Sequence, residues 1–557
     1  MKILITSMSL GAGETEAHVL KLSCALASMG HKVTVASNGG EHTKELEAHG
    51  IPHISVPLHK KDPISLANSY FILKALIKKE DFDIVHAHAR IPAFVCGQLQ
   101  KALKFRFITS AHNEFKVTSL YKRTSNWGEH CISASEEIKQ YIIDNYGMCA
   151  DNISVITHKE DDESAQMAKC HVEAYKKLMP FKHYKHGDIV ISGYYGYGNT
   201  GDDSLLLSII ETLRAQDTES RITVITKAPK KIQKRFGVRC ISRINIFAIA
   251  NELSHAKLLI SGGGSILQNS TSNRSLIYYT SVIALAKKLG TRVMLYSNGI
   301  GPLIGENAKR RAARAIKNAD AITLREPYSF EELSSLGIDK RCASVTADPA
   351  LLLSPAEESR IKFISKNAGI LDNKHYFAVS LREWRRLRNL MGSGDSNASE
   401  LALADAIDKI SMATGAEPIF IPMQPSRDSA ICERIRSMCK AESIFLSHMS
   451  AKELMGILKM TDFVIGMRLH ILIYATAVGV PVLGLAYDPK IDAFLEYSEQ
   501  RKAIGINDLT SEALVSALKE ITSNHEAIKE KIETKCAELR ILAKEDAKTA
   551  IDLVNKK

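Results

Sequence analysis

Short apolar runs alternate with longer amphipathic segments along most of the chain. The runs, such as residues 2–6 and 463–466, are bounded by glycine turns or charged residues, as is typical of buried strands. Between them lie segments such as residues 14–29, in which apolar positions recur at the helical period. Strands that alternate with helices form parallel sheets. The pattern therefore predicts an α/β fold made of Rossmann-like units of parallel sheet.

Breaks in this alternation divide the chain into parts. The first unit covers residues 1–158, and the charged segment 159–187, with a helical pattern in its middle, is interpreted as a linker. Two more alternating units cover residues 188–375 and 376–505, and residues 506–557 are predicted to be helical. A chain of 557 residues is too long for one hydrophobic core, so several units are expected.

One strand–turn–helix stretch carries the main candidate chemistry. Arg468 and His470 fall between the predicted strand 463–466 and the helix that follows, and Lys490 comes after the next strand. The carboxyl ends of parallel strands share one edge of a sheet, and helix starts expose N–H groups that bind anions. We therefore expect these three side chains to converge on a small anion that needs a proton. The alternative is that Arg468 and His470 only satisfy the local backbone.

Two glycine-rich segments follow predicted strands of the middle unit. The first, residues 193–203, contains the candidate binding residues Gly196, Asn199, Asp202 and Asp203, and it opens a helix. Clustered glycines let the backbone approach a ligand closely. Turn formation alone would explain two of the four glycines in this segment. The second, residues 262–264, includes Gly263 and Gly264 and is expected to form a loop of exposed N–H groups that binds an anion.

Composition narrows the classes of function. The net charge of +11 permits anionic substrates, lipid surfaces or nucleic acid, but aromatic residues make up only 6% of the chain and no arginine-rich block is interleaved with them. Nucleic-acid binding is therefore disfavoured. The ten cysteines include no C-x-x-C pair, which indicates reduced thiols in the cytoplasm. No signal peptide or membrane span is expected.

The first unit resembles the N-terminal domain of family-4 glycosyltransferases. The resemblance rests on Gly11-Ala-Gly13-Glu14, Gly30-His31-Lys32-Val33, Asp83-Ile-Val-His86-Ala-His88 and Ser133-Ala-Ser135-Glu136. The resemblance implies that this unit corresponds to the half of such an enzyme that mainly faces the acceptor. The sugar-nucleotide half of that family, with its paired glutamates, is not visible in the rest of the sequence, so sugar transfer by this half alone is not expected. His86 and His88 point the same way on a strand, and a hydrogen-bonded pair is preferred to a pair of metal ligands.

Residues from about 188 to 500 resemble the bacterial polysaccharide pyruvyl transferase family. The motifs that match, in order, are the loop 193–203, Gly262-Gly-Gly264, Asn298-Gly-Ile-Gly301-Pro302, Leu324-Arg325-Glu326, Asp348-Pro349, Ser380-Leu-Arg382, Gly466-Met-Arg468-Leu-His470 and Tyr487-Asp-Pro-Lys490. The resemblance implies that the second and third units are the N-terminal and C-terminal halves of a GT-B-like pair. It also implies transfer of the pyruvyl group of phosphoenolpyruvate, with release of phosphate, onto a lipid-linked or nucleotide-linked glycan precursor.

Residue roles follow from this chemistry. His470 is assigned as the proton donor, and Arg468 and Lys490 as clamps for the carboxylate and phosphate. Neighbouring cations should favour the neutral form of His470 until the dianion binds. Further substrate-binding residues are Arg310, chosen by family analogy, Arg382, for which an interdomain salt bridge is the alternative, and Gln424 after a predicted strand.

Other functions remain open at this stage. A GT-B glycosyltransferase that uses a nucleotide sugar and a non-catalytic scaffold in glycan assembly are the alternatives. No metal-ligand spacing is recognised, so neither a metal nor a cofactor is expected beyond phosphoenolpyruvate as donor substrate. The expected location is the cytoplasm, with peripheral contact at the inner face of the membrane.

Overall fold

A computed structural model describes most of the chain. The described residues are 1–103, 105–114, 117–157, 164–178, 186–218, 220–270, 272–384, 396–446 and 449–556. They form two compact units, the first made of Met1–His183 with Lys234–Gly237 and the second of Tyr184–Gln233 with Val238–Lys557.

The first unit is built on one parallel sheet with strand order β3-β2-β1-β4-β5-β6-β7. Its strands are β1 (Lys2–Thr6), β2 (Lys32–Ser37), β3 (His53–Ser55), β4 (Ile84–His88), β5 (Arg106–Ala111), β6 (His130–Ser133) and β7 (Ile153–Val155). Its helices are α1 (Glu14–Ser28), α2 (Thr43–Ala48), α3 (Pro63–Glu80), α4 (Arg90–Leu103), α5 (Ser119–Thr124), α6 (Glu136–Tyr146) and α7 (Ser164–Leu178). The order reverses between β1 and β4, and open α/β sheets bind ligands at such a switch point.

Helix α7 lies in the segment interpreted as a linker, yet it belongs to the first unit. Its Val172 and Tyr175 are buried in the same apolar cluster as Val19 and Leu26 of α1. The charged residues around α7 suggested a solvated linker, but one side of the helix covers the sheet. The other parts of the predicted linker, residues 159–163 and 179–185, lie outside the described residues.

The second unit contains two parallel sheets. The first has the order β10-β9-β8-β11-β12-β13-β14. Its strands are β8 (Ile189–Ser192), β9 (Ile222–Thr226), β10 (Arg239–Ser242), β11 (Leu258–Leu267), β12 (Arg292–Ile300), β13 (Ala321–Leu324) and β14 (Ser344–Val345). Residues 262–264 were expected to form a loop after a short strand. They instead continue β11, because Gly262 and Gly264 still pair with Tyr296 and Asn298 of β12. The register of this pairing shifts between Gly264 and Leu267.

The other sheet of this unit has the order β17-β16-β15-β18-β19-β20. Its strands are β15 (Tyr376–Ser380), β16 (Glu417–Phe420), β17 (Ile444–Phe445), β18 (Phe463–Gly466), β19 (Val482–Ala486) and β20 (Ile504–Gly505). In all three sheets the first strand in the chain pairs with both the second and the fourth. The predicted α/β class, with three Rossmann-like units of parallel sheet, is confirmed.

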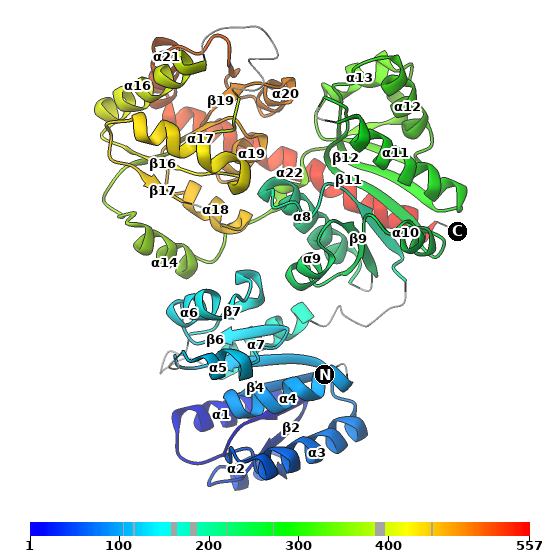
Figure 1. Cartoon of the computed structure of the whole chain (residues 1–557), viewed down its shortest axis with the longest axis vertical. Coiled ribbons are helices and arrows are strands. Elements are labelled where there is room, and N and C mark those ends of the chain that lie inside the picture. The colour runs from blue at the N-terminus through cyan, green and yellow to red at the C-terminus, as the bar shows by residue number, and fades with distance from the viewer. Residues whose placement is uncertain are drawn as a thin grey trace. The chain divides into compact units, whose positions relative to one another are not determined.

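Helices flank both sheets of the second unit, and the red helix α22 (His525–Asn555) spans the two halves (Figure 1). It contacts α8, β11 and β12 of one half and α19 of the other. One buried apolar cluster includes Leu205, Leu351, Leu472 and Leu539, so the halves share a core. The other helices of this unit are α8 (Thr200–Gln216), α9 (Pro229–Phe236), α10 (Ile246–Leu253), α11 (Asn273–Lys288), α12 (Glu306–Lys317), α13 (Ser329–Ser335), α14 (Glu358–Ala368), α16 (Ser396–Thr414), α17 (Pro425–Met438), α18 (Ala451–Leu458), α19 (Leu469–Ala477), α20 (Pro489–Tyr497) and α21 (Ser511–Ser523).

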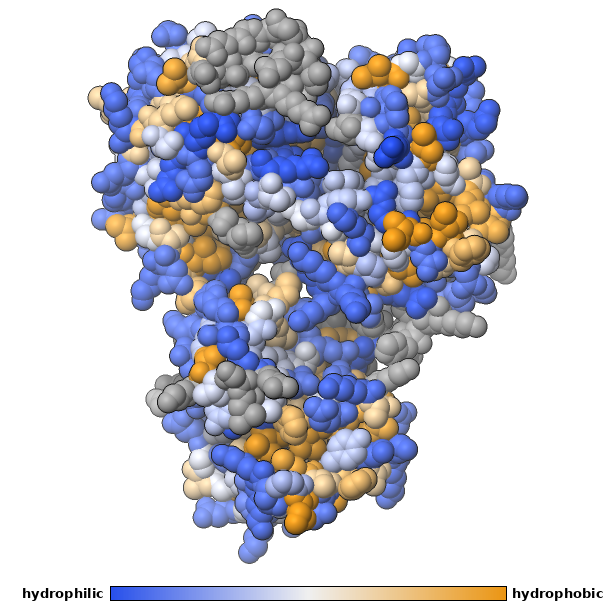
Figure 2. Space-filling model, viewed as in Figure 1, coloured by the Kyte–Doolittle hydropathy of each residue, from blue (hydrophilic) through white to orange (hydrophobic). Residues whose placement is uncertain are grey.

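The visible surface is mostly hydrophilic, with hydrophobic residues gathered over α10 (Figure 2). Ile244, Ile246 and Phe247, at the start of that helix, are exposed. Within the described ranges, no helix combines the length and the apolar character that crossing a membrane requires.

Candidate functional site

The strand β18 ends at Gly466, and α19 begins three residues later with Arg468 as its N-cap. Gly466 allows this tight connection, because a Cβ there would lie 2.6 Å from Ile471 and 2.7 Å from Leu472. His470 therefore stands in the first turn of α19, whereas the sequence pattern predicts it between the strand and the helix. Backbone N–H groups of a first turn have no partner within the helix, which favours anions near His470.

Arg468 is held by a buried carboxylate. Its Nη2 and Nε donate to Asp428 of α17, at 2.6 Å and 3.1 Å, and Nη2 lies 3.5 Å from Oε1 of Gln424. Asp428 also accepts from the backbone N–H of Gln424 at 2.8 Å. A two-point contact of this kind fixes the plane of the guanidinium. The predicted residues Arg468 and Gln424 therefore meet, and Asp428 is a partner that the sequence analysis did not assign to the site.

His470 lies between the two halves of the unit. An added Cβ at Gly201, in the first turn of α8, would be 2.4 Å from its Nδ1. On the other side, its Nε2 is 4.0 Å from Oδ2 of Asp348. Burial, together with the charges of Arg325, Lys490 and Arg468, lowers the pKa of His470 to about 3. The imidazole is therefore neutral at pH 7 in the ligand-free protein, as expected from its cationic neighbours.

Arg325 holds a buried network of charges beside His470. It donates to Glu326 at 2.8 Å, to Asp348 at 3.3 Å and to the Ser265 hydroxyl at 2.9 Å. Asp348 also caps the following turn by accepting from the N–H of Ala350 at 3.0 Å. Burial raises the pKa of Asp348, and Arg325 opposes that rise. The sequence analysis noted Arg325 and Asp348 only as motif residues. Their position after the strands β13 and β14 was the signal that could have placed them in the site.

The start of α8 supplies acidic and amide groups. Asn199 caps this helix by accepting from Gly201 N–H, and its amide also donates to Asp202. Burial and the neighbouring Asp203 raise the pKa of Asp202 to about 7, although Arg468 and Lys490 lower it. Asp203 accepts from the N–H of Gly196 at 3.4 Å. Asp202 is thus a carboxyl group that can exchange a proton near neutral pH.

Glycines let the backbone pass close to these acidic residues. Gly196, Gly263 and Gly264 have φ values of +82°, +72° and +82°, which favour glycine. An added Cβ at Gly264 would lie 3.8 Å from Oδ1 of Asp202. The second glycine segment therefore borders the start of α8, although it is part of β11 and not a free loop.

Lys490 and Arg382 flank Tyr487. Lys490 lies in the first turn of α20, and its ammonium is 2.9 Å from Asp488 and 5.8 Å from the centre of the Tyr487 ring. Arg382, after β15, donates to the Tyr487 hydroxyl at 2.6 Å. Among the described residues, the contact found for Arg382 is with this tyrosine, and no salt bridge to Arg382 is seen.

Arg310 does not join this group in the structure. It lies exposed on α12, where it donates to Asn307 one turn earlier at 2.7 Å. The prediction for Arg310 rested on family analogy, and the residue faces solvent because the apolar side of α12, with Ala308 and Ala312, packs on the sheet.

The two halves are joined directly at the site. The Tyr474 hydroxyl of α19 donates to Ser204 of α8 at 2.6 Å, and the N–H of Thr200 donates to Met423 O at 3.3 Å. Asp202, Arg382 and His470 follow β8, β15 and β18, which are strands beside the two switch points. Arg325 and Asp348 follow β13 and β14, and Lys490 follows β19. Arg468, His470, Lys490 and Asp202 are close enough for their charges to act on one another.

Several solved structures match over about two thirds of this chain. A putative UDP-N-acetylglucosamine 2-epimerase from Listeria monocytogenes is 14% identical, with a TM-score of 0.47 over 66% of this chain and 96% of that chain. UDP-GlcNAc 2-epimerase from Neisseria meningitidis, bound to UDP-GlcNAc, is 11% identical, with a TM-score of 0.47 over 66% and 99%. HepE from Anabaena, in complex with UDP and glucose, is 11% identical, with a TM-score of 0.46 over 67% and 100%. The comparison with curated proteins gave no match.

Family models match both units. The Glycosyltransferase Family 4 model matches residues 15–158. The polysaccharide pyruvyl transferase model matches residues 199–489, which is more than half of the 557 residues and includes Asp202, Arg325, Arg468 and His470. The chain therefore belongs to the polysaccharide pyruvyl transferase family, and it is a glycan-modifying transferase.

Proposed function

We propose that the protein transfers the pyruvyl group of phosphoenolpyruvate onto two hydroxyls of a sugar in a cell-surface polysaccharide precursor, with release of phosphate. The observation that carries this proposal is the position of His470, in the first turn of α19 with Arg325, Arg468 and Lys490 acting on it. Phosphoenolpyruvate carries a carboxylate and a phosphate, so cations and helix N–H groups suit it.

The first step adds a proton and a hydroxyl across the double bond. His470, protonated once the donor is bound, gives its proton to the methylene carbon, and the neighbouring carbon becomes electron-poor. An acceptor hydroxyl attacks that carbon, and its own proton passes to a base. Asp202 suits this role, because its pKa of about 7 lets it accept a proton at neutral pH.

The second step closes the ketal. A second hydroxyl of the same sugar attacks the same carbon, and the bond from carbon to the phosphate oxygen breaks with its electron pair going to phosphate. The proton of this hydroxyl leaves with the phosphate, and the base returns its proton to His470 through the site. One phosphoenolpyruvate and one diol thus give one ketal and one phosphate, and no metal or redox cofactor is required for balance.

The charge of the donor explains how a neutral histidine can act as an acid. Without ligand, three cations and burial hold the pKa of His470 at about 3. The bound dianion compensates those cations, and Asp348 stands 4.0 Å from Nε2 to support the imidazolium. Protonation of His470 is therefore coupled to donor binding.

The acceptor is proposed to be a lipid-linked or nucleotide-linked glycan precursor. Such a precursor would place the protein in the cytoplasm with peripheral contact at the inner face of the membrane. The first unit, which matches Glycosyltransferase Family 4, is suited to holding the glycan.

The test combines phosphoenolpyruvate with a panel of lipid-linked disaccharides. Expected are phosphate release that depends on the acceptor, and an acceptor heavier by one pyruvate less one water. Phosphoenolpyruvate should also raise the melting temperature of the protein, because a ligand that binds only the folded state stabilises it. Stabilisation by nucleotide sugars alone, with sugar transfer to the same panel, would support a glycosyltransferase instead.

A further inference from the structure

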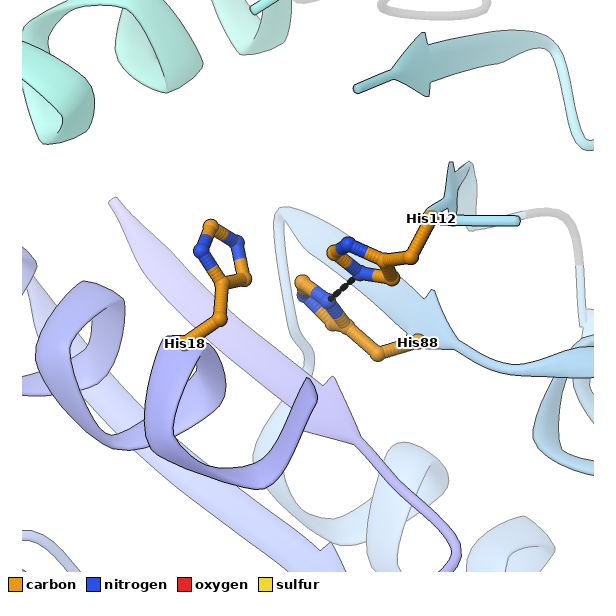
Figure 3. A group of neighbouring side chains, drawn as sticks. All are labelled: His18, His88 and His112. Carbon is orange, nitrogen blue, oxygen red and sulfur yellow. Dashed lines mark hydrogen bonds between the residues drawn. The ribbon is translucent and has the colours of Figure 1, made fainter. Parts of the chain in front are cut away.

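Three histidines of the first unit gather at the carboxyl edge of its sheet (Figure 3). His18 comes from α1, His88 ends β4, and His112 follows β5 directly. One ligand nitrogen of each lies within 4.8 Å of those of the other two. They stand beside the switch point between β1 and β4, where open α/β sheets bind ligands.

The spacing of two of the nitrogens suits a shared metal ion. Nδ1 of His88 lies 3.3 Å from Nε2 of His112. A tetrahedral zinc ion with Zn–N bonds of about 2.0–2.1 Å separates two ligand nitrogens by about 3.3 Å. A plain hydrogen bond between the two rings is the competing explanation, and distance alone does not separate them.

The surroundings of His88 favour the metal. His88 is fully buried; its Nδ1 faces Nε2 of His112, and its other ring nitrogen, Nε2, has no hydrogen-bond partner among the described residues. A buried nitrogen without a partner calls for a bound ion or water. The approach of one nitrogen from each of three imidazoles to within 4.8 Å favours an ion. His18 and His112 are half-buried, which leaves an approach from solvent.

A fourth histidine, His86, borders the cluster next to His88 on β4. His86, 4.1 Å away between ring centroids, is held by Tyr175 and Ser110, each at 2.9 Å. The hydrogen-bonded state expected for the histidine pair on β4 therefore applies to His86.

We propose that His18, His88 and His112 bind one divalent transition-metal ion of the zinc class. Three imidazoles are a ligand set that zinc accepts, and three protein ligands leave a coordination position for water or a ligand oxygen. This site lies in the first unit and is separate from the chemistry proposed around His470. It departs from the expectation of a metal-independent protein. That expectation relied on spacing along the chain, and these ligands come from three distant segments.

The experiment titrates Co²⁺ into the full-length protein after treatment with a chelator. We expect one Co²⁺ per chain, with the visible absorption of a four-coordinate ion, and its displacement by Zn²⁺. His18→Asn and His112→Asn should each weaken binding more than about 100-fold, because even groups behind the ligands contribute 10–100-fold. His49→Asn, an exposed histidine of the same unit, is the matched control and should bind as the unchanged protein does.

Melting temperatures of the variants show whether they fold. An independent measurement needs no variant: X-ray absorption of the zinc-loaded protein should count three imidazole ligands. Binding of less than one ion per chain, unchanged affinity in either cluster variant, or a ligand shell without imidazole would each overturn the proposal.

Discussion

Nε2 of His470 faces Oδ2 of Asp348 across 4.0 Å, and no described residue gives that nitrogen a hydrogen bond. Asp348 is in turn held by Arg325 at 3.3 Å. The acid proposed for the reaction is therefore a neutral imidazole whose Nε2 is buried next to a carboxylate that is already oriented. This arrangement is suited to an imidazolium that forms only when a dianion is bound.

Replacing this imidazole should remove the proton donor without removing the fold. His470→Gln is expected to lower kcat by about 100- to 10,000-fold, since that is the range for a positioned acid, while the melting temperature changes little. The measurement is phosphate release from phosphoenolpyruvate with an active acceptor. His375→Gln, whose side chain is 73% exposed, is the control and should keep full activity. A His470→Gln enzyme with unchanged kcat and pH profile would remove His470 from the mechanism.

A methyl group at Gly201 should displace the His470 ring. An added Cβ there lies 2.4 Å from Nδ1, closer than atoms tolerate, so the ring must move. Gly201→Ala is expected to lower kcat by about 100-fold, the cost of a shift of about 1 Å in a reacting group. Gly11→Ala, with no atom within 4 Å of the added Cβ, is the control. Full activity in Gly201→Ala would show that the position of this ring is not critical.

Replacement of Arg325 should destabilise the protein much more than replacement of Arg310. Arg325→Met leaves Glu326 and Asp348 buried without their cation, and loss of one partner of a buried ion pair costs about 3–5 kcal/mol. Arg310→Met, on the exposed side of α12, should change the free energy of unfolding by no more than about 0.5 kcal/mol. Urea unfolding of both variants measures the difference. Equal stabilities would mean that the buried network does not support the fold.

The sequence predicted the placement of those site residues that come directly after a strand. Arg468, His470 and Lys490 were predicted to converge because each follows a strand of one parallel sheet, and the structure brings them together. Arg310, which was chosen by family analogy, lies exposed on α12, and a helical residue of this kind has no strand end to position it.

Contacts across separate elements were beyond prediction. The pairing of Arg325 with Asp348 joins a strand end to the turn after β14, and the cluster of His18, His88 and His112 joins three segments. Neither has a local signature, because side chains distant in sequence meet only through sheet order. The packing of α7 on the first unit was missed for a related reason: the charged residues around it hid the buried Val172 and Tyr175.

Asp546 should make stability depend on pH in an unusual direction. This buried carboxyl of α22 accepts from the Thr346 hydroxyl at 2.9 Å, and burial raises its pKa to about 8 from 3.8. The folded protein therefore binds a proton that the unfolded chain releases above about pH 4, and stability contributed by this group falls as pH rises from about 4 to about 8. The loss approaches about 1.4 kcal/mol per pH unit. Asp546→Asn should remove this pH-dependent loss of stability. The melting temperature of the variant, relative to that of the unchanged protein, should therefore rise between pH 5 and pH 8. Asp552→Asn, an exposed position on the same helix, is the control and should follow the unchanged protein. A stability difference between Asp546→Asn and the unchanged protein that stays constant over this range would show that Asp546 is ionised in the folded state.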